Sequence, residues 1–308
     1  VNTISSSRNP DGSEDTFNSL SFLGAYMAFE EIDDSKMLGR FKFDHQLLDC
    51  GASGYNLAYH QVCIGKALND LGVAILSSYS SGHTRSCMEA LRMYNQTQPV
   101  VGSKTTSSLL SSKKDWPNFV RTIKTTVTAV PSFVQFLKSF KYDRVNLFYS
   151  DETFGRDYYK YMVEALNKSN IEVMNPENLR ALPNGITSDP SNFTNLAEPV
   201  KASGVRPVMF LALPNYIVGL VENLYDIGLR ADDLLLLHQG SDDTMWTYGS
   251  KEQINKRMSI GLGSLFFDQS TFVGELGAEI RTKLIKYTKG ELISSQCQYY
   301  DSVYLIAH

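Results

Sequence analysis

The chain has 308 residues, which by the usual length of domains is enough for two of them. Its 29 Lys and Arg residues stand against 33 Asp and Glu residues, so the formal net charge is −4 and no basic excess is present to bind nucleic acid or an anionic membrane. Hydrophobic residues at 43% and charged residues at 20% are typical of a globular protein. The longest apolar run, VMFLAL at 208–213, is strand-sized, so no membrane-spanning segment is predicted.

Helical and strand-like segments alternate along the chain from residue 20 onwards. In chain order they are helix 20–33, strand 41–49, helix 55–70, strand 73–77, helix 84–95, strand 99–103, helix 132–140, strand 144–150, helix 156–168, strand 171–174, helix 193–203, strand 206–213, helix 215–228, strand 234–237, a strand or crossover at 258–267, and helices 271–289 and 299–308. Continuously apolar strands separated by helices predict an α/β protein with two doubly wound parallel sheets. The irregular stretch at 113–131, which ends in Pro131, is predicted to be the first crossing between them.

Motifs for catalysis, cofactors and metals fail when their spacing is examined. The run Gly102-Ser103-Lys104-Thr105 lacks the glycine that precedes Gly-Lys in a phosphate-binding loop. Five histidines are scattered without the i,i+4 pairing of a metal site, and the four cysteines show no C-x-x-C spacing. The sequence therefore predicts no enzyme, no cofactor and no metal centre.

Loops rich in hydroxyl groups follow several of the predicted strands. They are SSYSSGHT at 77–84, SKTTSS at 103–108, SDETFG at 150–155 and QGSDD at 239–243. Open α/β sheets bind ligands at the carboxyl ends of their strands, where such loops converge on a crevice. Ser, Thr and Gly also populate ordinary loops, so each run alone is weak evidence of a site.

The compartment is indicated by three sequons for N-glycosylation, at Asn95, Asn167 and Asn192. A chain this rich in Asn, Ser and Thr generates sequons by chance. Together with an even number of cysteines, they nevertheless favour a secreted or lumenal protein.

Several segments resemble one known family in order and spacing: AYMAFEEID (25–33), SSYSSGHT (77–84), GSKTTSSLLS (102–111), FVRTI (119–123), FLKSFKYDRVNLFYSDETFGRD (136–157) and YYDSVYLIAH (299–308). They span nearly the whole chain, and FYSDETFGRD and YYDSVYLIA are the most specific. The family is the receptor-family ligand-binding region, which has the type I periplasmic-binding-protein fold. It includes the ectodomains of natriuretic-peptide receptors and class C G-protein-coupled receptors, and bacterial amino-acid binding proteins.

The resemblance implies two α/β lobes joined by a hinge, with the fold truncated at both ends. Lobe 1 would comprise residues 1–123, lobe 2 residues 124–257, and residues 258–308 would return to lobe 1. The implied function is that of a non-enzymatic, extracellular or cell-surface module that closes on a small ligand. The parent protein would be a larger, membrane-anchored receptor. The alternatives are a structural or assembly glycoprotein without a ligand and a soluble solute-binding protein.

The ligand set is likewise implied by the resemblance. In family members that bind amino acids, loops of lobe 1 hold the α-carboxylate, and the matching residues here are Ser80, Ser81, Thr84, Thr105 and Thr106. Phe154 stands where lobe 2 provides a stacking aromatic residue, and Asp242 matches the acidic partner of the ammonium group. The sequence departs from the pattern because Ser108 replaces a proline, and because His83 and Lys104 stand where small residues are common.

A disulfide and an interface are also implied for lobe 1. Related ectodomains have a disulfide in this region, which favours Cys50–Cys87, with Cys63–Cys87 as the rival pairing and Cys297 free or paired outside the chain. The helix at 55–70 carries a second apolar stripe that includes Tyr55 and Tyr59, and relatives dimerise through lobe 1 helices. We therefore expect a homo-oligomer, unless a neighbouring segment covers that stripe.

Overall fold

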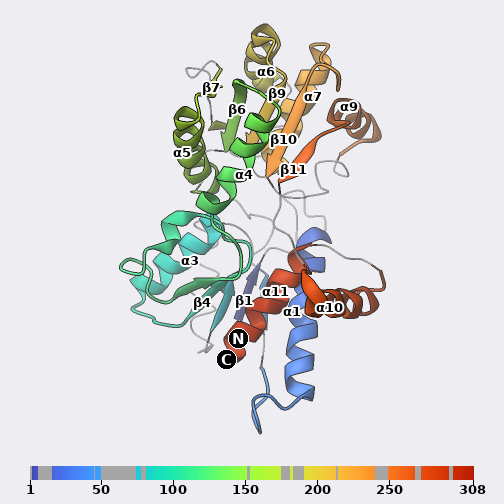
Figure 1. Cartoon of the computed structure of the whole chain (residues 1–308). Helices are drawn as coiled ribbons and strands as arrows, with labels where there is room; N and C mark the ends of the chain where they lie inside the picture. The colour runs from blue at the N-terminus through green and yellow to red at the C-terminus, as the bar shows by residue number, and fades with distance from the viewer. Residues whose placement is uncertain are drawn as a thin grey trace. The chain divides into compact units, whose positions relative to one another are not determined.

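The computed structural model describes residues 2–5, 16–44, 46–49, 74–77, 81–150, 153–174, 181–182, 191–212, 214–239, 249–267, 272–290 and 294–308 (Figure 1). The chain divides into two compact units. Unit 1 comprises Val1–Thr125 and Ser270–His308, and unit 2 comprises Thr126–Gln269. Each unit has a parallel sheet with its own helices, so the predicted α/β class with two parallel sheets is confirmed.

Unit 1 is built on a five-stranded sheet of order β2-β1-β3-β4-β5. Its strands are β1 (Asn2–Ser5), β2 (Gln46–Asp49), β3 (Ile75–Ser77), β4 (Val100–Gly102) and β5 (Phe119–Arg121), and all pairs are parallel. Its helices are α1 (Thr16–Asp34), α3 (Ser81–Met93), the 3₁₀ turn η1 (Ser108–Ser111), α10 (Gly274–Tyr287) and α11 (Ser294–Ala307). The apolar strands β3 and β4 lie in its interior, where Ile75, Leu76, Val100 and Val101 are buried.

Helices α1 and α11 of unit 1 pack closely although they are far apart in the sequence. A side chain at Gly24 would place its Cβ only 2.1 Å from the carbonyl oxygen of Gln296, so glycine permits the contact. The Phe22 and Tyr299 rings meet edge to face nearby, with centroids 5.1 Å apart. This pairing explains why α1 is apolar on most faces. One side of α1 packs against α11, and another side packs against the sheet residues Leu76 and Val101.

A polar cluster joins α1 to both C-terminal helices. Lys283 donates to Glu31 at 2.6 Å, and the Tyr300 hydroxyl donates to the other carboxylate oxygen of Glu31 at 2.6 Å. Burial acts to raise the pKa of Glu31, but these hydrogen bonds and the charge of Lys283 outweigh it, so the pKa is lowered. The hydrogen bonds to Glu31 and Glu279 raise the pKa of Lys283. The cluster therefore stabilises the charged forms of both groups.

Unit 2 has a sheet of order β11-β10-β9-β6-β7, with β8 paired to β6. Its strands are β6 (Arg144–Ser150), β7 (Glu172–Val173), β8 (Ala181–Leu182), β9 (Pro207–Leu211), β10 (Leu235–Gln239) and β11 (Leu265–Phe267). Its helices are α4 (Thr126–Ser139), α5 (Thr153–Lys168), α6 (Ser191–Ser203), α7 (Pro214–Asp226) and α9 (Lys251–Gly261). On one face, Val145, Leu147, Met209, Leu211 and Leu237 pack against α4 and α5.

The other face of this sheet carries a row of rings in register across four strands. Phe148 pairs with Phe210, Phe210 with His238, and His238 with Phe266. The ring centroids are 5.9, 5.0 and 5.0 Å apart, and all three pairs are stacked. Burial lowers the pKa of His238 to about 3, so the imidazole is neutral at physiological pH. His238 therefore serves as a core residue.

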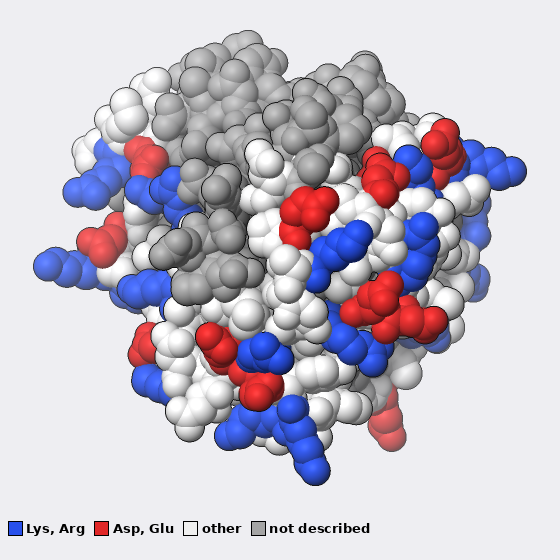
Figure 2. Space-filling view, turned by 90° about the horizontal axis from the view of Figure 1, so that it is seen from above, with Lys and Arg blue, Asp and Glu red and all other residues white. Residues whose placement is uncertain are grey.

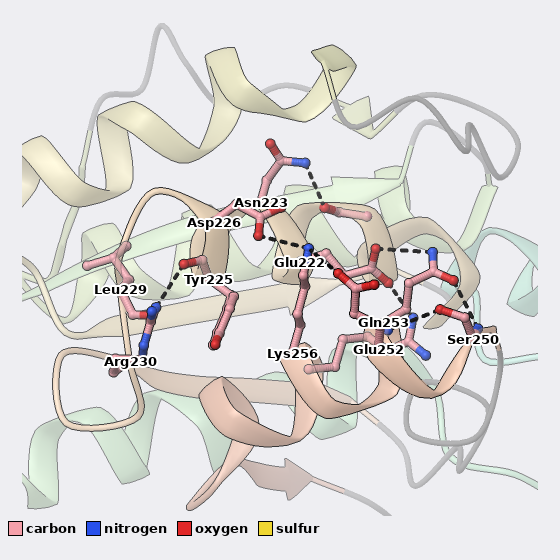
Figure 3. Close-up of polar contacts among 12 residues, drawn as sticks. Glu222, Asn223, Tyr225, Asp226, Leu229, Arg230, Ser250, Glu252, Gln253 and Lys256 are labelled. Carbon is pink, nitrogen blue, oxygen red and sulfur yellow. Dashed lines mark hydrogen bonds and ion pairs between the residues drawn. The ribbon is translucent and has the colours of Figure 1, made fainter.

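A polar layer holds α9 against α7 (Figure 3). Arg257, with a side chain only 1% exposed, donates to Glu222 at 2.5 Å. Lys256 pairs with Asp226 at 3.1 Å, and Ser250 with Gln253 forms a capping box at the start of α9. Arg230 lies over the Tyr225 ring, 3.9 Å from its centroid, in the turn that follows α7. Charged pairs therefore fix the position of α9 in unit 2.

Three details differ from the sequence prediction. β11 pairs in parallel with β10, so residues 258–269 belong to unit 2 and the predicted return to lobe 1 at 258 comes too early. The stretch around 113–131 contains β5, and α4 begins at Thr126 with Pro131 inside it. A proline inside a helix removes one backbone hydrogen bond and crowds the carbonyl of the residue four positions earlier, yet α4 continues through Pro131, so this proline does not mark the helix start.

Charge is mixed on the face of the molecule that Figure 2 shows. Figure 2 shows Lys and Arg side chains interspersed with Asp and Glu side chains on one face, without a field of a single sign. This pattern agrees with the near-neutral net charge and does not favour nucleic acid as a partner. Among the described helices, none is long and apolar enough to span a membrane.

Candidate ligand-binding site

A cluster of buried hydroxyl groups lies at the carboxyl ends of β3 and β4 in unit 1. These strands are parallel neighbours with Ser77 opposite Gly102, so the segments that follow them emerge at the same edge. Helix α3 begins at Ser81, and the segment 103–107 follows β4. The buried members of this cluster, which we call the hydroxyl cluster, are Ser81, Thr84, Ser103, Thr105, Thr106 and Ser107.

Two hydrogen bonds join α3 to the segment after β4. The hydroxyls of Thr84 and Thr105 are 2.5 Å apart, and the Ser107 backbone N–H donates to the Ser81 hydroxyl at 3.1 Å. Four residues predicted from the sequence (Ser81, Thr84, Thr105 and Thr106) thus come together in one buried cluster. Their role in binding is not thereby shown, and it stays a proposal.

Arg121 on β5 holds the segment after β4 in place. One guanidinium nitrogen, Nη1, donates to the carbonyl oxygens of Thr105 at 3.1 Å and Ser107 at 2.7 Å. The other, Nη2, donates to the Ser111 hydroxyl at 3.0 Å, and the guanidinium carbon lies 5.0 Å from the centroid of the Phe119 ring. In the sequence this arginine is only part of the FVRTI resemblance, and its contacts were not predicted. Every residue has a backbone carbonyl, so residue types do not show which carbonyl oxygens an arginine binds.

Gly102 gives the segment the room it needs. A Cβ there would lie 2.8 Å from Thr105 Oγ1 and 2.9 Å from the Phe119 ring, closer than real Cβ contacts. Thr105 therefore packs directly over the end of β4. The close approach of Thr105 and Phe119 requires glycine here, whereas the backbone φ angle is one that other residues can adopt.

Two hydroxyls of the cluster have no hydrogen-bond partner in the described part of the chain. They are Thr106 Oγ1 and Ser103 Oγ, on residues that are 7% and 0% exposed. A buried hydroxyl without a partner costs about 1–3 kcal/mol, so native proteins rarely retain one without a purpose. Thr106 was predicted as a ligand residue, whereas Ser103 was not, because a serine in a serine-rich loop carries no distinguishing signal.

The electrostatics of the cluster suit an anionic group. Its members are neutral donors, the first turn of α3 contains no acidic residue, and a helix N-terminus carries partial positive charge. His83 in the same turn is buried, and Lys104 Nζ lies 6.0 Å from the centroid of the Tyr299 ring. The departures from the family pattern at these two positions are thus accommodated within unit 1.

Two predicted site residues, Ser80 of lobe 1 and Asp242 of lobe 2, lie outside the described residues. The other predicted residue of lobe 2 has a different role. Phe154 is 6% exposed and belongs to the core of unit 2, where its ring meets Tyr158 edge to face at 5.4 Å. Gly155 beside it lets α5 approach the end of β6, because a Cβ there would lie 2.1 Å from the Ser150 carbonyl oxygen. The structure thus gives Phe154 a packing role that the sequence did not predict.

Of the four cysteines, Cys87 and Cys297 lie in the described part of the chain, and they form no disulfide with each other. Burial raises the pKa of Cys87 to about 12, so the thiol is neutral and unreactive at physiological pH. Burial also raises the pKa of Cys297. Cys50 and Cys63 lie outside the described residues, so neither Cys50–Cys87 nor Cys63–Cys87 is tested, and the pairing stays a prediction.

The remaining predicted positions are mostly on helices. Asn95 is exposed in the turn after α3, Asn167 is exposed near the end of α5, and Asn192 lies in the first turn of α6. The apolar stripe predicted for self-association, at 55–70, lies outside the described residues. No group of three or more potential metal ligands occurs within the described ranges.

Comparison with protein families identifies one match. The family model described as "Receptor family ligand binding region" matches residues 21–308. A comparison with curated proteins gives no match. The family match covers both units and nearly the whole chain, and it confirms the resemblance drawn from the sequence motifs.

Proposed function

The chain belongs to the receptor-family ligand-binding region, and we propose that it is a non-enzymatic module that binds a small molecule of the amino-acid type. Members of this family are generally ligand-binding and non-enzymatic, and the chain carries no recognisable catalytic motif. We further propose that the module is extracellular and forms part of a larger, membrane-anchored receptor. The sequons support that placement.

The observation that carries the proposal is a pair of buried hydroxyls, on Thr106 and Ser103, for which the described part of the chain offers no hydrogen-bond partner. They lie beside the hydrogen-bonded members of the hydroxyl cluster, at the edge of the sheet where α/β proteins bind ligands. A carboxylate placed there accepts hydrogen bonds from neutral hydroxyls and from the N-terminus of α3. Such a ligand satisfies two groups that find no hydrogen-bond partner among the described residues.

The other half of the ligand is assigned to unit 2 by the family resemblance. Asp242 is proposed to bind the ammonium group, and Phe154 to contribute apolar surface from the core of its unit. In this proposal neither unit binds both charged ends of an amino acid, so closure requires the ligand.

A structural or assembly role without a small ligand is the second candidate. The buried position of Phe154 favours it, because a ring that fills the core is less available for stacking on a ligand. The bond between Thr84 and Thr105 favours it as well, since these hydroxyls already satisfy each other in part. A soluble solute-binding protein is the third candidate. Self-association through unit 1 helices is proposed for the receptor module and for the structural or assembly protein.

Ligand-induced stabilisation tests the leading proposal. The chain is heated with each common amino acid, and separately with acetate and with a simple alkylamine, which carry only one of the two charged groups. A ligand at one hundred times its Kd adds about 2.7 kcal/mol to the free energy of unfolding. We expect an amino acid to stabilise the chain and neither fragment to match it. No stabilisation by any amino acid would favour the structural candidate.

A variant then tests the assigned ammonium partner. Asp242→Asn is expected to weaken binding of the amino acid by about 1–3 kcal/mol, the scale of a hydrogen bond to a charged group. Asp243→Asn, at the neighbouring position, is the matched control and is expected to bind as the wild type does. Equal affinities for Asp242→Asn and the wild type would remove Asp242 from the site.

A further inference from the structure

A hollow of about 560 Å³ lies in unit 1 between the end of α3 and the segment 114–118. Its apolar lining residues are Met88 and Leu91, which are buried, together with Trp116 and Pro117. The remaining lining residues are polar or charged: Arg92, Asn95, Gln96, Thr97, Lys114, Asp115 and Asn118. A hollow lined by an aromatic ring and several amide groups is suited to a sugar ring, whose C–H face packs on the aromatic side chain while its hydroxyl and acetamido groups form hydrogen bonds.

Backbone and side-chain hydrogen bonds hold both sides of this hollow. Gln96 N–H donates to the Leu91 carbonyl oxygen at 2.8 Å and thereby closes the end of α3. Asn118 Nδ2 donates to the Gln98 carbonyl oxygen at 2.7 Å, and Trp116 N–H donates to the Ser112 carbonyl oxygen at 2.8 Å. The hollow is therefore a formed feature of unit 1.

One of the residues that line the hollow is the acceptor of a sequon, Asn95-Gln96-Thr97. Asn95 has a left-handed backbone, with φ +51°, and is exposed, as is Thr97. The hollow thus comes with its own point of covalent attachment. Asn167, by contrast, is exposed within α5 and lines neither this hollow nor the other pocket described, which lies on α4.

We propose that Asn95 is N-glycosylated and that the first N-acetylglucosamine of the glycan lies in this hollow against Trp116. The proposal rests on the extracellular placement proposed above, and it does not depend on whether the module binds a small molecule. In the transfer, a bond forms between Asn95 Nδ2 and C1 of the sugar, and the bond from C1 to the pyrophosphate of a lipid-linked oligosaccharide breaks. The lipid pyrophosphate leaves with the electron pair, and the amide nitrogen loses one proton.

Occupancy is measured first, on the full chain secreted from eukaryotic cells. Enzymatic removal of the glycans in H₂¹⁸O converts each occupied asparagine to a labelled aspartate, which peptide mass mapping detects. We expect label at residue 95 and none at this position in Asn95→Gln. Secreted protein without label at residue 95 would overturn the proposal, whatever the outcome of the ligand-binding screen.

The position of the sugar is measured second, on protein trimmed to a single N-acetylglucosamine and on fully deglycosylated protein. The chain has two tryptophans, so Trp246→Phe leaves Trp116 as the sole reporter. We expect the single sugar to reduce acrylamide quenching of Trp116 at least twofold and to raise Tm by about 2–4 °C, the scale of an aromatic contact in a chain this long. The shift in Tm is expected to persist in Asn167→Gln and to vanish in Trp116→Ala. Equal quenching with and without the sugar would overturn the assigned contact, even if Trp116→Ala failed to fold.

Discussion

The ion pair between Arg257 and Glu222 offers the sharpest test of how unit 2 is held together. The side chains are 1% and 13% exposed, and their charged atoms are 2.5 Å apart. Removing one partner of a buried pair costs about 3–5 kcal/mol, because the remaining charge is left in a poorly solvated place. In Glu222→Gln the amide oxygen still accepts a hydrogen bond, so we expect a loss of about 2–4 kcal/mol.

An exposed pair on the same helix is the matched control. Glu252 is 80% exposed and lies 3.6 Å from Lys256, so Glu252→Gln is expected to cost no more than about 0.5 kcal/mol. Urea denaturation gives both free energies of unfolding, and hydrogen exchange of the α7 and α9 peptides shows where protection is lost. A cost below about 1 kcal/mol for Glu222→Gln, or one equal to that of Glu252→Gln, would refute the reasoning.

Three further predictions concern unit 1. Gly102→Ala forces Thr105 and Phe119 aside and is expected to cost about 1–3 kcal/mol, so an unchanged Tm would contradict the close packing at the end of β4. Because the pKa of Glu31 is lowered, the stability difference between wild type and Glu31→Gln should be complete above the ordinary glutamate pKa of about 4.3. It should disappear as pH falls through the lowered pKa, and a difference independent of pH would argue against the bonds from Lys283 and Tyr300. Under reducing conditions that leave Cys87 a thiol, it should resist iodoacetamide in the native chain at pH 8, because burial raises its pKa to about 12, whereas rapid alkylation would show that it is accessible.

The sequence predicts the architecture well because periodicity and apolar runs report burial directly. Run 206–213 was predicted as a buried strand, and residues Pro207–Leu211 form β9 with every side chain buried. The prediction failed where local signals are ambiguous. Pro131 was expected to precede a helix and lies within α4, and LFF at 265–267 is too short to be distinguished from a crossover. Helix α9 was missed, since it buries little and is held by charge pairs instead of an apolar stripe.

The candidate site was predicted only in part, and the reasons are physical. The family motif gave Thr105 and Thr106, and both are buried in one cluster with Ser81 and Thr84. The same motif did not indicate that Arg121 binds the carbonyl oxygens of that segment, nor that Ser103 has no hydrogen-bond partner in the part of the chain that the structure describes. Backbone partners and unsatisfied groups depend on three-dimensional placement, which residue identity alone does not encode.

The central claim is that the Thr106 hydroxyl, which has no hydrogen-bond partner within the described ranges, is kept for a ligand, and calorimetry of Thr106→Val tests it most directly. Valine has nearly the same shape and removes the unpaired polar group, so the variant should be as stable as the wild type or more stable by about 1–2 kcal/mol. It should also bind the amino acid identified by the stabilisation screen at least tenfold more weakly. Undiminished affinity in a stable Thr106→Val protein would contradict the claim.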